Sequence, residues 1–228
     1  GRKGVGGAAT LLGVGGTCGV ETRVWCDGTP REGRRLNNPD QLGVGDGVMR
    51  AVPHHKIKSG DTFFAPRREK RNVRNRKMMD RMNQIVAGTG IALDFDRDVV
   101  PISEMQNGGT ITERHLSSAL ATAIEQKAGR GASLIAFLEG TFGKPVGEKF
   151  RAMFDDAENP YFHYDLIGWI KAEVVPLFYV DATDECPNVR DIIRLADETG
   201  AISAYAYLGD VGDSVTGDKR AQKFEDDY

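Results

Sequence analysis

The chain has 228 residues and a net charge of −3, and 40% of its residues are hydrophobic while 28% are charged. These values are typical of an ordinary soluble globular protein, and the length allows one large domain or one domain with an insertion. No run approaches the roughly 18 apolar residues that a membrane span needs, which excludes an integral membrane protein and a membrane partner.

The cysteines and the chain ends indicate a cytoplasmic fragment. Cys18, Cys26 and Cys186 are too few and too scattered for a disulfide framework or a CxxC metal site, which favours a reducing compartment. The first residues lack the order of a signal peptide, and the last residues stop within an acidic helical pattern that has no cap. We therefore expect the middle part of a longer gene product.

The first third of the chain is predicted to form strands and loops. A compact apolar run at 8–14 has strand length, and 19–26 alternates between two kinds of side chain, with Glu21 on the more polar face. Residues 27–46 are rich in Gly, Pro, Asn and Asp and predict a long surface loop. A short strand is expected at 48–52.

The middle of the chain is predicted to be helical. Ser59 is expected to cap a long helix that ends at Gly88 or Gly90, and a later helix is expected to be closed by Pro176. Residues 177–180 fit either a short strand or the end of that helix. A helix with Gly200 as its C-cap and a buried strand at 201–208 complete the pattern.

Strands at both ends and helices between them predict an α/β core that is interrupted by an α-helical insertion. On this interpretation, 1–58 form the N-terminal part of the core, 59–183 form an inserted, mainly helical subdomain, and 184–228 form the C-terminal part of the core. Both parts of the core are expected to be truncated.

The densest chemistry lies at 108–120, where a double glycine opens onto a helix start. Thr110 and Glu113 fit the Ser/Thr-x-x-Glu capping box, which places the positive end of the helix dipole close to Arg114 and His115. Such a start suits an anion and above all a phosphate, with Arg as a forked donor. The alternative is a solvated first turn in which His115 is partly packed.

Three residues are candidate metal ligands. Glu21 on its strand can bind a hard divalent ion, and His54 and His55 directly follow a strand and can supply imidazole nitrogens. The alternatives are a solvated glutamate that pairs with Arg23 and a histidine pair on the surface.

Other patterns are weaker. Residues 4–9 fit the loose GxGxxA form of a dinucleotide fingerprint, with Glu21 as a ribose ligand, but no strand can precede them in this chain. The basic block at 67–77 could contact a nucleic acid backbone, yet it lacks aromatic residues for base stacking and also fits a solvated helix face. No GxSxG, HExxH or P-loop is present, and no Ser or Cys catalytic triad is visible in the sequence.

Taken in order, three segments resemble the PHP (polymerase and histidinol phosphatase) family of metal-dependent phosphoesterases. Gly19-Val20-Glu21 resembles its Gly-x-Glu strand, 111–116 (ITERHL) resembles its Thr-x-x-His helix start, and 200–209 (GAISAYAYLG) resembles its Ala-His-Pro strand. The resemblance implies a partial distorted β/α barrel that binds two or three divalent ions (Mn, Fe, Zn or Mg). It makes Glu21 a metal ligand and directs Arg114 and His115 towards the substrate phosphate.

The sequence departs from the family pattern at several ligands. Tyr207 stands in place of the Ala-His-Pro histidine, and Arg50 stands where another histidine is expected, so His54 or His55 would substitute only with a shifted alignment. The family's opening His-x-His and closing Asp-x-His are absent from the sequence. The expected function is metal-dependent hydrolysis of a phosphate ester in a small phosphorylated metabolite or nucleotide. The alternatives are a module that binds nucleic acid or another polyanion through its basic helix, and a catalytically degenerate PHP scaffold.

Overall fold

The computed structural model describes residues 6–8, 17–38, 41–205, 207, 210–211 and 222–223. The chain divides into two compact units, which we call the sheet unit and the helical unit. The sheet unit comprises Gly1–Arg71, Gln106–Thr110 and Asp181–Tyr228, and the helical unit comprises Asn72–Met105 and Ile111–Val180. The predicted division at 58/59 and 183/184 stays a prediction.

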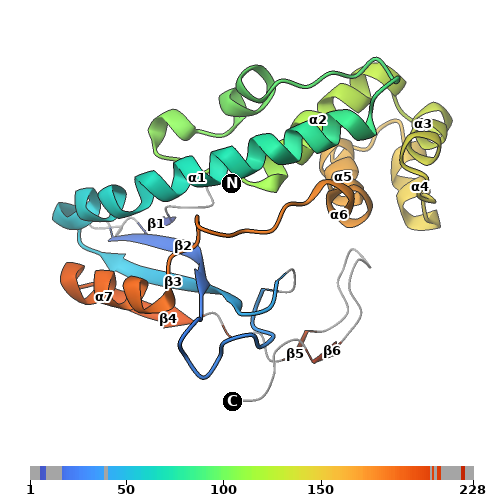
Figure 1. The fold of residues 1–228 in the computed structure, drawn as a ribbon. Helices are drawn as coiled ribbons and strands as arrows, with labels where there is room; N and C mark the ends of the chain where they lie inside the picture. Colours follow the sequence, from blue (N-terminus) through green and yellow to red (C-terminus); the bar gives the residue numbers. More distant parts are fainter. Residues whose placement is uncertain are drawn as a thin grey trace. The chain divides into compact units, whose positions relative to one another are not determined.

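The sheet unit contains a four-stranded sheet in the order β1-β2-β3-β4, in which every neighbouring pair is antiparallel (Figure 1). Its strands are β1 (Gly6–Ala8), β2 (Thr17–Trp25), β3 (Val44–Val52) and β4 (Ile202–Tyr205). A second pair joins β5 (Asp210–Val211) to β6 (Gln222–Lys223). The mixed α/β class is confirmed, but the described strands form an open antiparallel sheet and do not close into a barrel.

The predicted strand at 19–26 is confirmed by β2, whereas the predicted loop at 27–46 is wrong at its end because β3 already begins at Val44. The glycines of β3 suggested a loop, but here they make room for a neighbour. Asn37 donates through Nδ2 to the Asp46 carbonyl at 3.0 Å and accepts the Asp46 N–H at 2.6 Å. A Cβ on Gly45 would lie 3.3 Å from Asn37 Oδ1, so this close approach favours glycine.

Among the described residues, one face of this sheet packs against a hydrophobic cluster. Val24 and Met49 pack with Ile192 and Leu195 of α7 (Val189–Thr199), and Phe63 of α1 adds to the cluster. Strand alternation therefore directs the next residue of each strand to the opposite face. That face carries Glu21, Arg23, Asp46 and Arg50, as the register of β2 and β3 shows.

The predicted buried strand at 201–208 is shorter and is not buried. All four residues of β4 are exposed, and Ile202 is 63% exposed. In the described sheet, β4 pairs only with β3 and forms an edge, so hydrophobic composition alone could not reveal its exposure. Most of the apolar run at 8–14 lies outside the described residues, as does part of the segment 4–9, of which Gly6–Ala8 forms β1.

Helix α1 (Ile57–Ile85) begins directly after the short 3-10 turn His54–Lys56. Ser59 therefore lies inside the helix, and its prediction as the N-cap is wrong. The carbonyl of Pro53 accepts the Lys56 N–H at 2.8 Å, so backbone bonds rather than a serine side chain open this helical segment. Met78 and Met82 on the second half of α1 are buried in the core of the helical unit.

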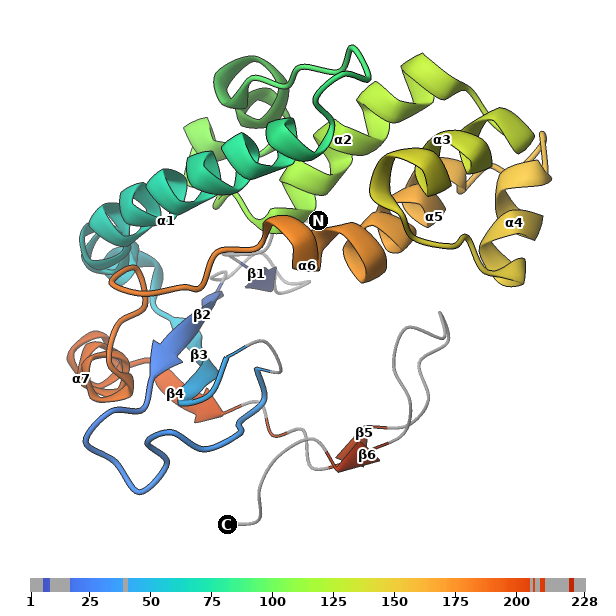
Figure 2. The same ribbon diagram turned by 45° about the vertical axis from the view of Figure 1, so that its right-hand side comes forward.

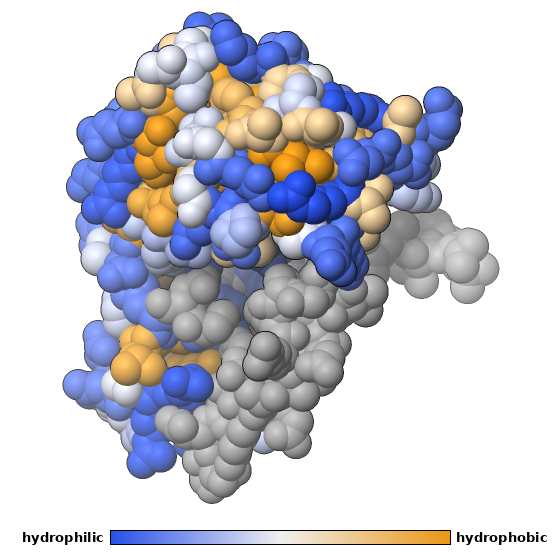
Figure 3. Space-filling view, turned by 90° about the vertical axis from the view of Figure 1, so that its right-hand side faces the viewer, coloured by the Kyte–Doolittle hydropathy of each residue, from blue (hydrophilic) through white to orange (hydrophobic). Residues whose placement is uncertain are grey.

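The remaining helices of the helical unit pack around one hydrophobic core that includes Leu120, Phe154 and Trp169 (Figure 2). They are α2 (Glu113–Ala128), α3 (Ala132–Phe142), α4 (Glu148–Asp155), α5 (Phe162–Trp169) and α6 (Val175–Phe178), with π-helical turns at Phe95–Val99 and Ile170–Val174 and a 3-10 turn at Val100–Ile102. A further 3-10 turn, Met105–Asn107, begins in the helical unit and ends in the sheet unit. On the face drawn in Figure 3, hydrophilic residues surround smaller groups of hydrophobic ones. Within the described residues, no helix combines the length and the apolar character that a membrane crossing requires.

Pro176 does not close the helix that begins at Phe162. The chain passes from α5 through the π-helical turn into α6, where Pro176 occupies the first turn. A proline is tolerated there because its missing N–H would have no partner within that turn. Leu177 and Phe178 are consequently helical, and a strand at 177–180 is excluded.

Candidate functional site

The start of α2 is fixed by a cap that differs from the predicted one. The helix begins at Glu113 with Thr112 as its N-cap, so the predicted capping box of Thr110 and Glu113 is wrong by two residues. His115 takes the role of the reciprocal residue, because its Nδ1 accepts the Thr112 N–H at 3.1 Å. The Thr112 hydroxyl oxygen lies 3.2 Å from the same nitrogen.

The segment that enters α2 is anchored from α1. Asn75 is buried and donates through Nδ2 to the Ile111 carbonyl at 3.0 Å, and Ile111 itself is buried. Both residues belong to the helical unit. The first turn of α2 is therefore held by a buried contact on one side and by its own cap on the other.

The cap also determines the protonation of His115. A nitrogen that accepts an N–H carries no proton, so the neutral ring holds its proton on Nε2. Burial lowers the pKa of His115 below its ordinary value. At neutral pH, His115 is a neutral hydrogen-bond donor through Nε2.

Arg114 is exposed, and its guanidinium has no hydrogen bond or ion pair within the described part of the chain. A cation in the first turn of a helix is opposed by the positive end of the helix dipole. An anion at this position would relieve that repulsion and would satisfy the forked donors of the guanidinium. Arg114 and His115 thus both lie in the first turn of α2, at an end of the helix that favours negative charge.

The three predicted metal ligands are not brought together. Glu21 is exposed on β2 opposite Val48, while His54 and His55 are exposed in the turn after β3. His54 and His55 follow Val52, which pairs with Cys18 of β2. Cys18 is three residues from Glu21, so the backbone positions of Cys18 and Glu21 along β2 are about 10 Å apart.

Among the described residues, no group of three or more His, Cys, Asp or Glu side chains could hold a metal ion. The described residues alone therefore do not complete the metal centre that the resemblance implies.

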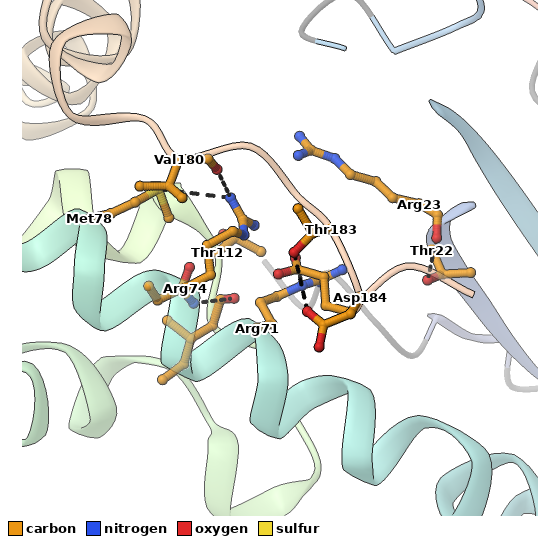
Figure 4. Close-up of polar contacts among 12 residues, drawn as sticks. Thr22, Arg23, Arg71, Arg74, Met78, Thr112, Val180, Thr183 and Asp184 are labelled. Carbon is orange, nitrogen blue, oxygen red and sulfur yellow. Dashed lines mark hydrogen bonds and ion pairs between the residues drawn. The ribbon is translucent and has the colours of Figure 1, made fainter. Parts of the chain in front are cut away.

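The basic block of α1 is largely engaged within the protein. Arg74 is buried and donates to the Val180 carbonyl at 2.8 Å (Figure 4), and Arg76 makes a two-pronged ion pair with Asp96 at 2.7 and 2.9 Å. The other partnered cations are Arg67 with the Phe63 carbonyl, Arg68 with Asp61, Lys70 with Asp184 and Arg71 with Glu185. These contacts compete with a polyanion for the same donors.

The cysteines and Tyr207 are the remaining candidates from the sequence. Cys26 and Cys186 are buried free cysteines, and burial raises the pKa of the Cys26 thiol. Tyr207 is exposed, and its N–H donates to the Tyr205 carbonyl at 3.2 Å.

The structure also joins three residues that no sequence motif connected. Ser118 Oγ lies 3.2 Å from His163 Nε2, and His163 Nδ1 lies 3.6 Å from Glu125 Oε2. A signal for half of this arrangement exists, because residues 118 and 125 are seven apart and share one face of a helix. His163 is 45 residues away from Ser118 in the sequence, and nothing in a local pattern links it to that face.

Comparison of the chain with family models, curated proteins and solved structures gives no match. The assignment of a function therefore depends on the residues described above, together with the motifs that resemble the PHP family.

Proposed function

We propose that the chain is part of a PHP-like, metal-dependent phosphoesterase and that the start of α2 binds the phosphate of a small phosphorylated metabolite or nucleotide. The observation that carries this proposal is Arg114, an exposed first-turn cation without a partner in the described residues, next to a histidine whose cap presents Nε2–H. The described four-stranded sheet is antiparallel, so the proposal does not rest on a likeness to the distorted β/α barrel of that family.

The two side chains would contribute in different ways. The Arg114 guanidinium would donate two parallel N–H bonds to phosphate oxygens, which gives both charge and orientation. His115 would add one neutral donor through Nε2 without adding a second positive charge beside Arg114. The positive end of the α2 dipole favours the same anion.

Divalent ions would supply the hydroxide that attacks the phosphate ester in a PHP enzyme. Glu21 remains the proposed ligand from this chain, because it is exposed on the polar face of the sheet and has no partner in the described residues. The described residues do not complete such a centre, so we assign them no hydrolytic step.

The alternative of a degenerate PHP scaffold is favoured by one specific observation. The sheet register separates Glu21 from His54 and His55, which are the nearest imidazoles to β3 in sequence. A scaffold that keeps the phosphate-binding turn but lacks a working metal centre would bind a phosphate monoester without hydrolysing it.

Calorimetric titration with inorganic phosphate and with glycerol phosphate tests the binding site. We expect Arg114→Ala to weaken both affinities about 10-fold or more, because a charged hydrogen bond contributes roughly 1.5–3 kcal/mol. The matched control is Lys127→Ala, which removes one positive charge from the last turn of the same helix. Equal weakening by both variants, or no binding by the unaltered protein, would overturn the assignment.

Phosphate release in the presence of added Mn²⁺ separates the enzyme from the degenerate scaffold. A phosphoesterase predicts metal-dependent release that falls in Glu21→Gln, whereas the degenerate scaffold predicts binding without release. If Mn²⁺ stimulates release equally in the unaltered protein and in Glu21→Gln, Glu21 is not a ligand.

A further inference from the structure

Ser118, His163 and Glu125 lie side by side on the surface of the helical unit. Ser118 and Glu125 lie on one face of α2, and the His163 ring from α5 lies between them with Nε2 towards the serine and Nδ1 towards the glutamate. The side chains of His163 and Glu125 are 35% and 33% exposed, so this arrangement is accessible to solvent.

The hydroxyl of Ser118 differs from those of its neighbours in α2. Ser117 donates to the Glu113 carbonyl at 2.9 Å, and Thr122 donates to the Ser118 carbonyl at 3.0 Å. Such bonds to the carbonyl four residues earlier are the usual fate of a hydroxyl inside a helix. Ser118 Oγ instead lies 3.2 Å from an imidazole nitrogen that can accept its proton.

Glu125 lies on the side of the imidazole where a carboxylate favours the form that this proton transfer needs. A carboxylate 3.6 Å from Nδ1 favours the proton on that nitrogen, which leaves Nε2 as the acceptor that faces Ser118. Glu125 also forms an ion pair with Arg130, whose Nη2 lies 3.3 Å from Glu125 Oε1. Arg130 Cζ also lies 4.2 Å from the ring centre of Phe162, the residue that precedes His163.

We propose that Ser118 is a base-activated nucleophile that reacts with small acyl esters, with His163 as its general base and Glu125 as a positioning residue. In this reaction, Ser118 Oγ bonds to the ester carbonyl carbon while His163 Nε2 takes the hydroxyl proton. The bond from that carbon to the ester oxygen breaks, and His163 returns the proton to the leaving oxygen. The products are an acyl-serine and an alcohol, and water then hydrolyses the acyl-serine.

The surroundings of His163 favour esters with an aromatic group. Tyr161 and Tyr164 are 66% and 73% exposed at the start of α5. The Tyr164 ring centre lies 6.5 Å from that of His163, with the two rings nearly perpendicular. Exposed aromatic faces beside the base would stack with an aryl leaving group.

Turnover is expected to be slow because Ser118 lies inside a helix. The backbone N–H groups around it belong to the helical hydrogen-bond ladder and do not form the pair of donors that stabilises an oxyanion. Loss of one such donor costs about 10²–10³ in rate in serine hydrolases. The reaction should therefore be detected first as a single acylation rather than as rapid turnover.

Incubation with p-nitrophenyl acetate, followed by peptide mass mapping and by release of p-nitrophenolate, tests the proposal. We expect one acetyl group on Ser118, no such modification in Ser118→Ala, and a rate about 10²-fold lower in His163→Gln, as loss of a general base predicts. The matched control is Ser133→Ala on α3, whose hydroxyl donates to the Ala128 carbonyl at 2.7 Å. Acetylation only at other residues, or equal labelling in Ser118→Ala and Ser133→Ala, would overturn it.

The role of Glu125 needs a measurement that loss of packing would not change. In Glu125→Gln, the ¹⁵N shifts of the His163 ring should show loss of the preference for a proton on Nδ1, and acetylation should slow. An unchanged tautomer with unchanged labelling contradicts the positioning role. Circular dichroism establishes that each variant is folded. Phosphate binding at Arg114 is measured separately, so this proposal and the proposed function can fail independently.

Discussion

The helical unit and the sheet unit bury their hydrophobic residues in different ways. The helical unit packs its helices around a fully enclosed core in which Leu120, Ile124 and Leu166 have no exposed surface. The sheet unit has a small cluster on one sheet face, while the opposite face carries charged side chains. Stability in the helical unit should therefore depend on packing, whereas single charged contacts should matter more in the sheet unit.

The largest effect is expected in the core of the helical unit. Leu120→Ala should lower the free energy of unfolding by about 3 kcal/mol, because it removes buried methyl groups and leaves a cavity. The matched substitution in the sheet unit is Ile202→Ala on the exposed edge strand. It should change the free energy of unfolding by about 0.5 kcal/mol or less. Urea unfolding followed by circular dichroism measures both, and equal effects would contradict the difference in burial.

The second effect tests the ion pair of the sheet unit. Glu185 is 3% exposed, and its carboxylate lies 3.2 Å from Arg71 Nε. Arg71→Met keeps most of the side-chain volume but leaves the buried carboxylate without this cation, and we expect a loss of about 2 kcal/mol. Arg68→Met breaks the exposed pair with Asp61 and should cost about 0.5 kcal/mol or less. A larger loss of stability in Arg68→Met than in Arg71→Met would contradict the greater importance of the buried ion pair.

The third effect distinguishes the observed helix cap from the predicted one. Thr112→Ala should destabilise the helical unit by about 1 kcal/mol, the usual cost of losing an N-cap side chain. Thr110→Ala should have little effect, because Thr110 lies before the cap. Thermal unfolding of the two variants measures the difference, and the opposite order would restore the capping box that the sequence suggested.

The smallest effect is a dependence of stability on pH. Burial lowers the pKa of His115 below its ordinary value of 6.5, so the unfolded chain binds a proton more readily than the folded one. The stability that the neutral ring contributes is fully present above pH 6.5 and is lost as the pH falls towards the lower folded pKa. Between pH 7.5 and pH 5, the free energy of unfolding should therefore fall more steeply in the unaltered protein than in His115→Gln. An identical pH dependence in the two proteins would contradict a lowered pKa of His115 in the folded state.

Much of the fold follows from local sequence patterns. The alternation in β2 and the helical periodicity between 57 and 178 predicted the element types, because each pattern reflects a single buried face. A strand was predicted at 201–208, but its exposure and the glycine-rich start of β3 were not, since edge position and the docking of Asn37 depend on distant parts of the chain. Local signals also misplaced the cap of α2 by two residues, because a histidine replaced the expected glutamate as the reciprocal partner.

The candidate sites show the same limit. Arg114 and His115 were predicted together because they are adjacent in one helical turn. The link between Glu21 and the two histidines stays a prediction, because adjacency of two strands does not specify which residues are level with one another. The contact of Ser118 with His163 joins two helices, and only their packing brings the residues into contact.

The most direct test of the central claim is an NMR titration of the His115 ring with inorganic phosphate. The account predicts that the Nε2 proton signal shifts with phosphate concentration, that Arg114→Ala abolishes most of the shift, and that Lys127→Ala preserves it. A His115 signal that does not respond to phosphate, in a protein that remains folded, would contradict the account.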